Sequence, residues 1–235
     1  MKKDRIARSF ILHQKIYNLK GKIMNITGAI FDFDGTLFDS MPLWKGLKFE
    51  FFDKKGLVLT EKDKQDFSGL FLMEALPLAK KRFNLDESIN ELQNQFFELL
   101  KEKYLEKAIP KNDIIPFLEK LQNKGVKMGI ATATGEAALI PLLKKFDMLK
   151  YFSSIYSTYT VGVSKNEPVV FDTVLNELGT EKNTTWVFED AFYAANTAKK
   201  NGYNVVGIYD KSEPEPESLK NISDIYITNY NELTP

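Results

Sequence analysis

One acidic stretch at the end of an apolar segment limits what this chain can fold into. Residues 26–31 predict a strand, and Asp32, Asp34 and Gly35 follow it directly. Because side chains alternate in an extended chain, both carboxylates face the same side. In open α/β sheets, ligands bind at the carboxyl ends of the strands. Paired carboxylates repel each other, and a hard divalent cation such as Mg²⁺ relieves this repulsion. The alternative is a strand that ends in an ordinary acidic turn.

The composition excludes several kinds of chemistry. The 235 residues contain no cysteine and one histidine, His13. A disulfide framework, a thiolate nucleophile, a histidine-dependent triad and an ordinary zinc site therefore lack their residues in the body of the chain. The formal net charge of +0 gives no sign of a nucleic acid partner. An enzyme built from this chain must use carboxylates, lysines, hydroxyls and a hard metal ion.

The order of predicted elements indicates an α/β core interrupted by helices. After residue 110, strands are expected at residues 126–131, 154–156, 185–188 and 203–208, and a last short strand within residues 222–227. Helices are expected between them at residues 113–124, 135–146, 168–178 and 191–201. This alternation is typical of βαβ units in a parallel sheet. Only helical patterns occur before it, at residues 41–55, 61–69, 70–83 and 86–107. The proline- and glutamate-rich segment 211–217 predicts a surface loop.

Further polar residues stand at the ends of later predicted strands or just before helices. Thr132 ends one strand, Lys165 precedes the helix at 168–178, and Glu189 and Asp190 follow another strand. The carboxyl ends of parallel strands meet at one crevice, so these side chains are candidates for the same site. Each also has an ordinary structural explanation. Thr132 would be a turn hydroxyl, Lys165 a solvated surface charge, and the pair Glu189–Asp190 acidic N-caps of a helix.

The sequence D-F-D-G-T-L-F-D-S at residues 32–40 resembles the first motif of the haloacid dehalogenase-like hydrolases, a superfamily of mostly phosphatases. Thr132, Lys165 and the pair Glu189–Asp190 follow in the order of that family's later motifs. The resemblance is to its phosphatase and β-phosphoglucomutase-like branch, and implies a Rossmann-like parallel sheet core with an inserted all-helical cap domain. Two residues depart from the pattern. Ala133 stands where many relatives carry Asn, and Asn166 replaces the first proline of K-P-x-P.

The resemblance implies a Mg²⁺-dependent phosphomonoester hydrolase that works through an aspartyl-phosphate. Asp32 would be the nucleophile and Asp34 the general acid and base. The implied metal ligands are Asp32, Asp34 through its backbone carbonyl, Asp190, and Glu189 directly or through water. The implied phosphate-binding groups are Gly35, Thr132, Ala133 through its backbone N–H, and Lys165.

The implied domains are an α/β catalytic core at residues 24–40 and 110–235 and a helical cap at 41–109. Residues 1–23 are basic and mixed, and we expect a loosely ordered extension there. The expected partner is a small phosphorylated metabolite, with no nucleic acid and no membrane. We expect a cytoplasmic protein; the sequence does not indicate the oligomeric state, and a monomer is favoured.

Two alternatives to a phosphatase stay open. A phosphosugar mutase of the same family would move phosphate within a sugar, but such relatives usually carry a histidine soon after the first motif, and this chain has none. Arg82 could hold a second phosphate, although in Lys80-Lys81-Arg82 it more resembles a solvated face. The other alternative is a non-catalytic binding module, against which the full set of acidic residues and Lys165 argues.

Overall fold

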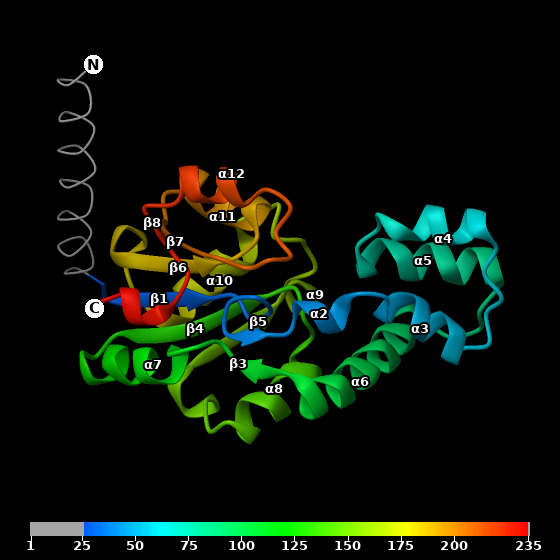
Figure 1. Cartoon of the computed structure of the whole chain (residues 1–235), viewed down its shortest axis with the longest axis horizontal. Coiled ribbons are helices and arrows are strands. Elements are labelled where there is room, and N and C mark those ends of the chain that lie inside the picture. The colour runs from blue at the N-terminus through cyan, green and yellow to red at the C-terminus, as the bar shows by residue number, and fades with distance from the viewer. Residues whose placement is uncertain (1–25, 235) are drawn as a thin grey trace, which may run out of the picture.

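The computed structural model describes residues 26–234, so the extension expected at residues 1–23 lies outside the described part. These residues form a six-stranded parallel sheet with helices on both faces (Figure 1). Its strand order is β5-β4-β1-β6-β7-β8. The strands are β1 (Gly28–Phe31), β4 (Lys127–Thr132), β5 (Ser154–Ser157), β6 (Thr185–Glu189), β7 (Asn204–Ile208) and β8 (Ile225–Ile227).

Alternate side chains of β1 enter two different hydrophobic cores. Ala29 and Phe31 pack with residues of α7 and α8, whereas Ile30 packs with residues of α10, α11 and α12. The sheet is therefore the middle of three layers, as the period of two along a strand requires. The helices of these layers and their connections are α7 (Ile114–Asn123), α8 (Glu136–Lys145), α9 (Thr158–Val161), α10 (Val169–Leu178), α11 (Phe192–Lys200) and α12 (Pro216–Ile222).

A helical insert interrupts the chain between β1 and β4 and lies beyond one end of the sheet (Figure 1). Its helices are α2 (Met41–Trp44), α3 (Leu47–Lys54), α4 (Glu61–Ser68), α5 (Leu72–Phe83) and α6 (Ile89–Lys107). The short strands β2 (Phe38–Asp39) and β3 (Ile109–Pro110) pair antiparallel, so the chain enters and leaves the insert side by side. The expected α/β class with an inserted helical domain is confirmed. No helix among residues 26–234 is both long and apolar enough to cross a membrane.

Some predicted elements have different limits in the structure. The single helix expected at residues 41–55 is wrong, because Gly46 adopts φ +77° and separates α2 from α3. The loop expected at 211–217 is partly helical, since Pro216 begins α12, where its fixed φ suits a first helical position. The last short strand lies within the segment where it was expected, at Ile225–Ile227, whereas the short elements β2, β3 and α9 were not predicted.

We expect Gly129→Ala to destabilise the fold by about 1–3 kcal/mol, because it overpacks the contact between β4 and its neighbours. A Cβ on Gly129 would lie 2.5 Å from both Ser154 Oγ and Val174 Cγ1. Gly69→Ala is the matched control, since its Cβ would meet nothing within 4 Å. Urea denaturation of both variants measures the difference. Equal unfolding midpoints would show that the sheet tolerates the added methyl group.

Candidate active site

Three neighbouring strands bring polar side chains to one edge of the sheet. β1 lies between β4 and β6, so Asp32 leaves β1 beside the ends of those strands at Thr132 and Glu189. The chain passes from β1 to β4 on one side and later reaches β6 on the other. Such a reversal of strand order opens a crevice at the carboxyl ends of the strands, where open α/β sheets bind ligands.

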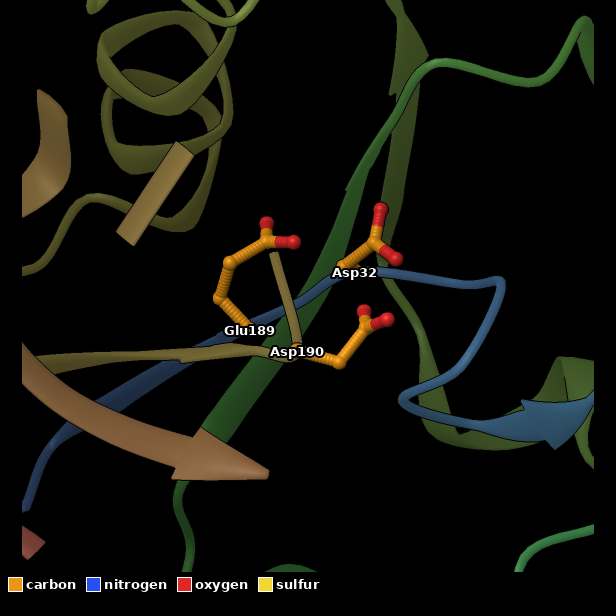
Figure 2. A group of neighbouring side chains, drawn as sticks. All are labelled: Asp32, Glu189 and Asp190. Carbon is orange, nitrogen blue, oxygen red and sulfur yellow. The ribbon is translucent and has the colours of Figure 1, made fainter. Parts of the chain in front are cut away.

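Asp32, Glu189 and Asp190 form a buried acidic cluster, which Figure 2 shows extending from the ends of two neighbouring strands. One carboxylate oxygen from each residue lies within 4.8 Å of the others, and none of the three residues is more than 6% exposed. Burial raises the pKa of all three carboxyls, that of Glu189 to about 8, and a neighbouring carboxylate raises each further, while Lys165 partly offsets the rise at Asp32 and Glu189. This donor set fits a hard divalent cation, because Mg²⁺ prefers oxygen ligands and offsets their repulsion.

Lys165 is the cation of this acidic cluster. Its side chain is 2% exposed, and Nζ donates to the Asp32 carboxylate and, at 2.8 Å, to Glu189 Oε2. Burial alone would lower the pKa of the ammonium group, but the charges of Asp32 and Glu189 outweigh burial and raise it. The lysine therefore stays protonated and compensates part of the buried negative charge.

A tight turn after β1 brings the backbone against the acidic cluster. Gly35 has φ +79°, and a Cβ there would lie 2.1 Å from Asp190 Oδ2. Thr36 Oγ1 also donates to Asp190 Oδ1 at 3.0 Å. Both the left-handed backbone and the close approach require glycine at this position.

The carboxylate of Asp34 is bound by three hydroxyl groups. Ser40 Oγ donates to Oδ1 at 2.6 Å, Tyr104 Oη donates to the same oxygen, and Thr134 Oγ1 donates to Oδ2 at 2.5 Å. Tyr104 comes from α6 of the insert, and Trp44 Nε1 of α2 donates to its Oη at 3.2 Å. A carboxylate oxygen accepts about two hydrogen bonds, so Oδ2 keeps a free lone pair while Oδ1 is fully bonded.

The end of β4 forms a turn beside Asp34. Thr132 Oγ1 accepts a hydrogen bond at 3.0 Å from the backbone N–H of Thr134, and both residues are 1% exposed. Ala133 lies between them and lines the cavity described next. The methyl side chain of Ala133 offers no hydrogen bond, so only its backbone can contribute one here.

A cavity of about 240 Å³ joins these groups. The sequence-predicted residues that line it are Asp32, Asp34, Thr132, Ala133, Lys165, Glu189 and Asp190. The remaining one, Gly35, touches the acidic cluster through Asp190. Residues separated by up to 158 positions in the sequence are thus gathered around one space.

Sequence reasoning missed the residues that bond Asp34, which are Ser40, Tyr104 and Thr134, and Trp44, which bonds Tyr104. Ser40 closes the first motif and Thr134 repeats the hydroxyl of Thr132 two positions later, so each had a local signal. Tyr104 had none, because its contact with Asp34 spans 70 positions and its helical spacing is that of ordinary core packing.

Comparison with known proteins matches residues 29–208 to the family model of the haloacid dehalogenase-like hydrolases. A phosphorylated carbohydrates phosphatase of Thermotoga maritima is 26% identical over 164 residues, which are 70% of this chain and 76% of the relative.

Similar solved structures include CbbY from Rhodobacter sphaeroides in complex with phosphate, with a TM-score of 0.74 and 18% identity. The match covers 88% of this chain and 96% of CbbY. A haloacid dehalogenase phosphatase from Thermococcus onnurineus has a TM-score of 0.65 and 24% identity, covering 88% of this chain and 95% of its own. At these identities the structures show the shared fold alone. The family model spans most of the sequence, and the chain belongs to the haloacid dehalogenase-like hydrolases.

Proposed function

We propose that this chain hydrolyses the phosphomonoester of a small metabolite, in a Mg²⁺-dependent reaction that passes through an aspartyl-phosphate. The observation that carries the proposal is the contact of Lys165 Nζ with Asp32 inside the buried acidic cluster. A carboxylate with a fixed cation and further metal-binding oxygens beside it can approach a phosphate dianion as a nucleophile. The T. maritima relative, named as a phosphatase of phosphorylated carbohydrates, supports the reaction and suggests the first substrates to test.

Asp32 and Asp34 divide the chemistry between them. In the first step an oxygen of Asp32 bonds to phosphorus, the bond from phosphorus to the leaving oxygen breaks, and protonated Asp34 gives that oxygen its proton. In the second step the Asp34 carboxylate takes a proton from water, whose oxygen attacks the phosphorus. The bond between Asp32 and phosphorus then breaks, which releases inorganic phosphate and restores both carboxyl groups.

Other residues of the cavity bind the metal and the phosphoryl group. Asp32, Asp190 and the backbone carbonyl of Asp34 would hold Mg²⁺, with Glu189 bound directly or through water. When bound, Mg²⁺ supplies positive charge against the transferring phosphoryl group. Lys165 places a second positive charge on the same group. The list of phosphoryl-binding groups is completed by the hydroxyl of Thr132 and the backbone N–H groups of Gly35 and Ala133.

We assign residues 41–109 to a cap over this core, to which residues 26–40 and 110–234 of the described chain belong. Trp44 and Phe71 of the insert line the cavity together with Asp32, so the insert forms one wall of the site. The paired strands β2 and β3 are the two connections on which such a cap would turn.

The observations favour a hydrolase over a mutase. A mutase holds a second phosphate, and Lys165, which is already paired with Asp32 and Glu189, is the one cation that lines the cavity within the described part of the chain. Arg82 does not line it; its guanidinium forms ion pairs of 2.8 Å with Asp63 and 2.9 Å with Asp66. The helix that follows the first motif carries Trp44 and no histidine.

Removal of the nucleophile tests the proposed reaction. We expect Asp32→Asn to lower phosphate release by at least about 10³-fold, because an amide cannot form the aspartyl-phosphate. EDTA should abolish release by the wild type, and added Mg²⁺ should restore it. The assay measures inorganic phosphate from p-nitrophenyl phosphate and from sugar monophosphates. Asp53→Asn, an exposed carboxylate of α3, is the control. Full activity of Asp32→Asn would exclude the mechanism.

Metal binding is expected to appear as thermal stabilisation. Mg²⁺ in large excess should raise the Tm of the wild type by roughly 5–10 °C, because it binds only the folded acidic cluster. Asp190→Asn should raise the Tm without Mg²⁺, since it removes a carboxyl whose ionisation is opposed by burial and by the neighbouring carboxylates, and should lose most of the Mg²⁺ effect. Differential scanning calorimetry measures both. Equal Mg²⁺ shifts in the two proteins would place the metal elsewhere.

Because Tyr104 donates a hydrogen bond to Asp34, we expect the loss of activity in Tyr104→Phe to depend on the leaving group of the substrate. We expect Tyr104→Phe to lower kcat/KM about tenfold for alkyl phosphates, whose leaving oxygen needs a positioned acid, and less than about twofold for 2,4-dinitrophenyl phosphate. The matched control is Tyr203→Phe, which removes the buried hydroxyl that donates to Asp172 at 2.6 Å. Equal losses for both substrates would indicate a purely structural role for Tyr104.

A further inference from the structure

A second cavity of about 210 Å³ adjoins the candidate active site. The two share five lining residues, Trp44, Phe71, Ala133, Lys165 and Tyr193. A phosphate bound to Lys165 would therefore direct the rest of its molecule along this shared wall. The second cavity is the space available to the leaving group.

Aromatic side chains from four parts of the chain line this second cavity: Trp44 of α2, Phe71 before α5, Tyr159 of α9 and Tyr193 of α11. Tyr159 packs edge-on against Phe97 at 4.8 Å between ring centroids, and Phe71 lies 6.0 Å from Tyr193. Phe71 is 62% exposed, so its ring is not needed to complete the hydrophobic core. An exposed apolar ring at the mouth of a cavity is typical of a ligand contact.

The charged residues that line the second cavity are already bonded. They are Lys165 and Glu74, and Glu74 accepts a hydrogen bond at 3.0 Å from the backbone N–H of Phe71 at the start of α5. Lys48, which lies near Glu74, donates to the carbonyl oxygens of Phe67 and Leu70. A second anionic group on the leaving group would thus find no free cation among the described lining residues.

Two tyrosine hydroxyls give the second cavity a neutral polar edge. Neither Tyr159 Oη nor Tyr193 Oη has a hydrogen-bond partner within residues 26–234, and burial raises the pKa of both phenols. Both hydroxyls therefore stay protonated and can donate to a neutral oxygen or nitrogen. Together with the ring faces, they suit a flat group with a polar rim.

We propose that this site takes monophosphates whose leaving group is a single uncharged ring, which packs against the aromatic wall formed by Phe71, Tyr159 and Tyr193. The inference rests on the proposed phosphatase function. An apolar cavity of about 150 Å³ holds benzene, so about 210 Å³ accommodates one ring with small substituents. The ring face can come from an aromatic ring or from the apolar side of a sugar ring, and the test separates them.

Four alkyl phosphates test the proposal by their kcat/KM values: benzyl phosphate, glucose 6-phosphate, glycerol 3-phosphate and fructose 1,6-bisphosphate. We expect the better of the two ring monophosphates to exceed glycerol 3-phosphate by about tenfold or more, and the bisphosphate by more. Which ring monophosphate is better identifies the ring. Equal or better turnover of glycerol 3-phosphate or the bisphosphate would overturn the inference while leaving the phosphatase function intact.

A binding measurement tests this inference independently of the proposed hydrolase function. Benzylphosphonate and methylphosphonate cannot be hydrolysed, and calorimetry with the wild type and Mg²⁺ gives their Kd values whether or not any phosphate ester turns over. We expect benzylphosphonate to bind about tenfold more tightly, by the area that the ring buries. If benzylphosphonate binds more tightly but no phosphate ester is hydrolysed, only the proposed hydrolase function is refuted. Equal Kd values, together with no preference for glucose 6-phosphate, would refute the ring site.

Truncation of Phe71 tests whether this side chain causes the preference for ring monophosphates. Phe71→Ala should lower the ratio of kcat/KM for the preferred ring monophosphate over glycerol 3-phosphate about fivefold or more, because only the ring substrate contacts this side chain. Val58→Ala is the control, since Val58 is an 89% exposed apolar residue of the insert that lines neither cavity. An unchanged ratio in Phe71→Ala would show that the ring, if bound, lies elsewhere.

Discussion

Three carboxylates and one lysine are buried together at the carboxyl edge of the sheet, and the repulsion among them governs the packing around them. Burying a charge without a partner costs several kcal/mol. The chain meets this cost with Lys165, which contacts Asp32 and Glu189, and with hydrogen bonds such as that from Thr36 to Asp190. The net negative charge that remains is what a divalent cation would neutralise. The same excess of charge that weakens the fold therefore creates affinity for a metal.

The insert is joined to this charged centre through Asp34. Tyr104 belongs to α6 and bonds a carboxylate that belongs to the core, while β2 and β3 hold the two connections together. A movement of α6 relative to the sheet would change the number of hydroxyl groups on Asp34. The proton donor of the proposed reaction is thereby linked to the position of the insert, by a contact that Trp44 reinforces.

Local pattern and strand period were sufficient to predict the sheet and the residues at its edge. Asp32, Thr132 and Glu189 could be predicted because a parallel sheet places the ends of its strands together whatever the loops do. The hydroxyl shell of Asp34 could not, since Tyr104 approaches from 70 positions away and depends on how α6 packs. Likewise the sequence does not distinguish Gly46 from a glycine that a helix tolerates in its interior. Only the left-handed backbone conformation of Gly46 separates α2 from α3.

The cavity beside Asp32 is lined by charged groups, whereas the second cavity, which adjoins it, is lined by aromatic rings. In the proposed reaction, ionic groups bind the part that all phosphate esters share, and aromatic rings contact the part that distinguishes one ester from another. Lys165 and Asp32 are both buried, and in a medium of lower dielectric constant each charge acts more strongly on the phosphoryl group of the proposed reaction. A leaving group that fills the aromatic cavity would therefore do more than bind. It would complete the water-excluding wall on which the electrostatic part of the reaction depends.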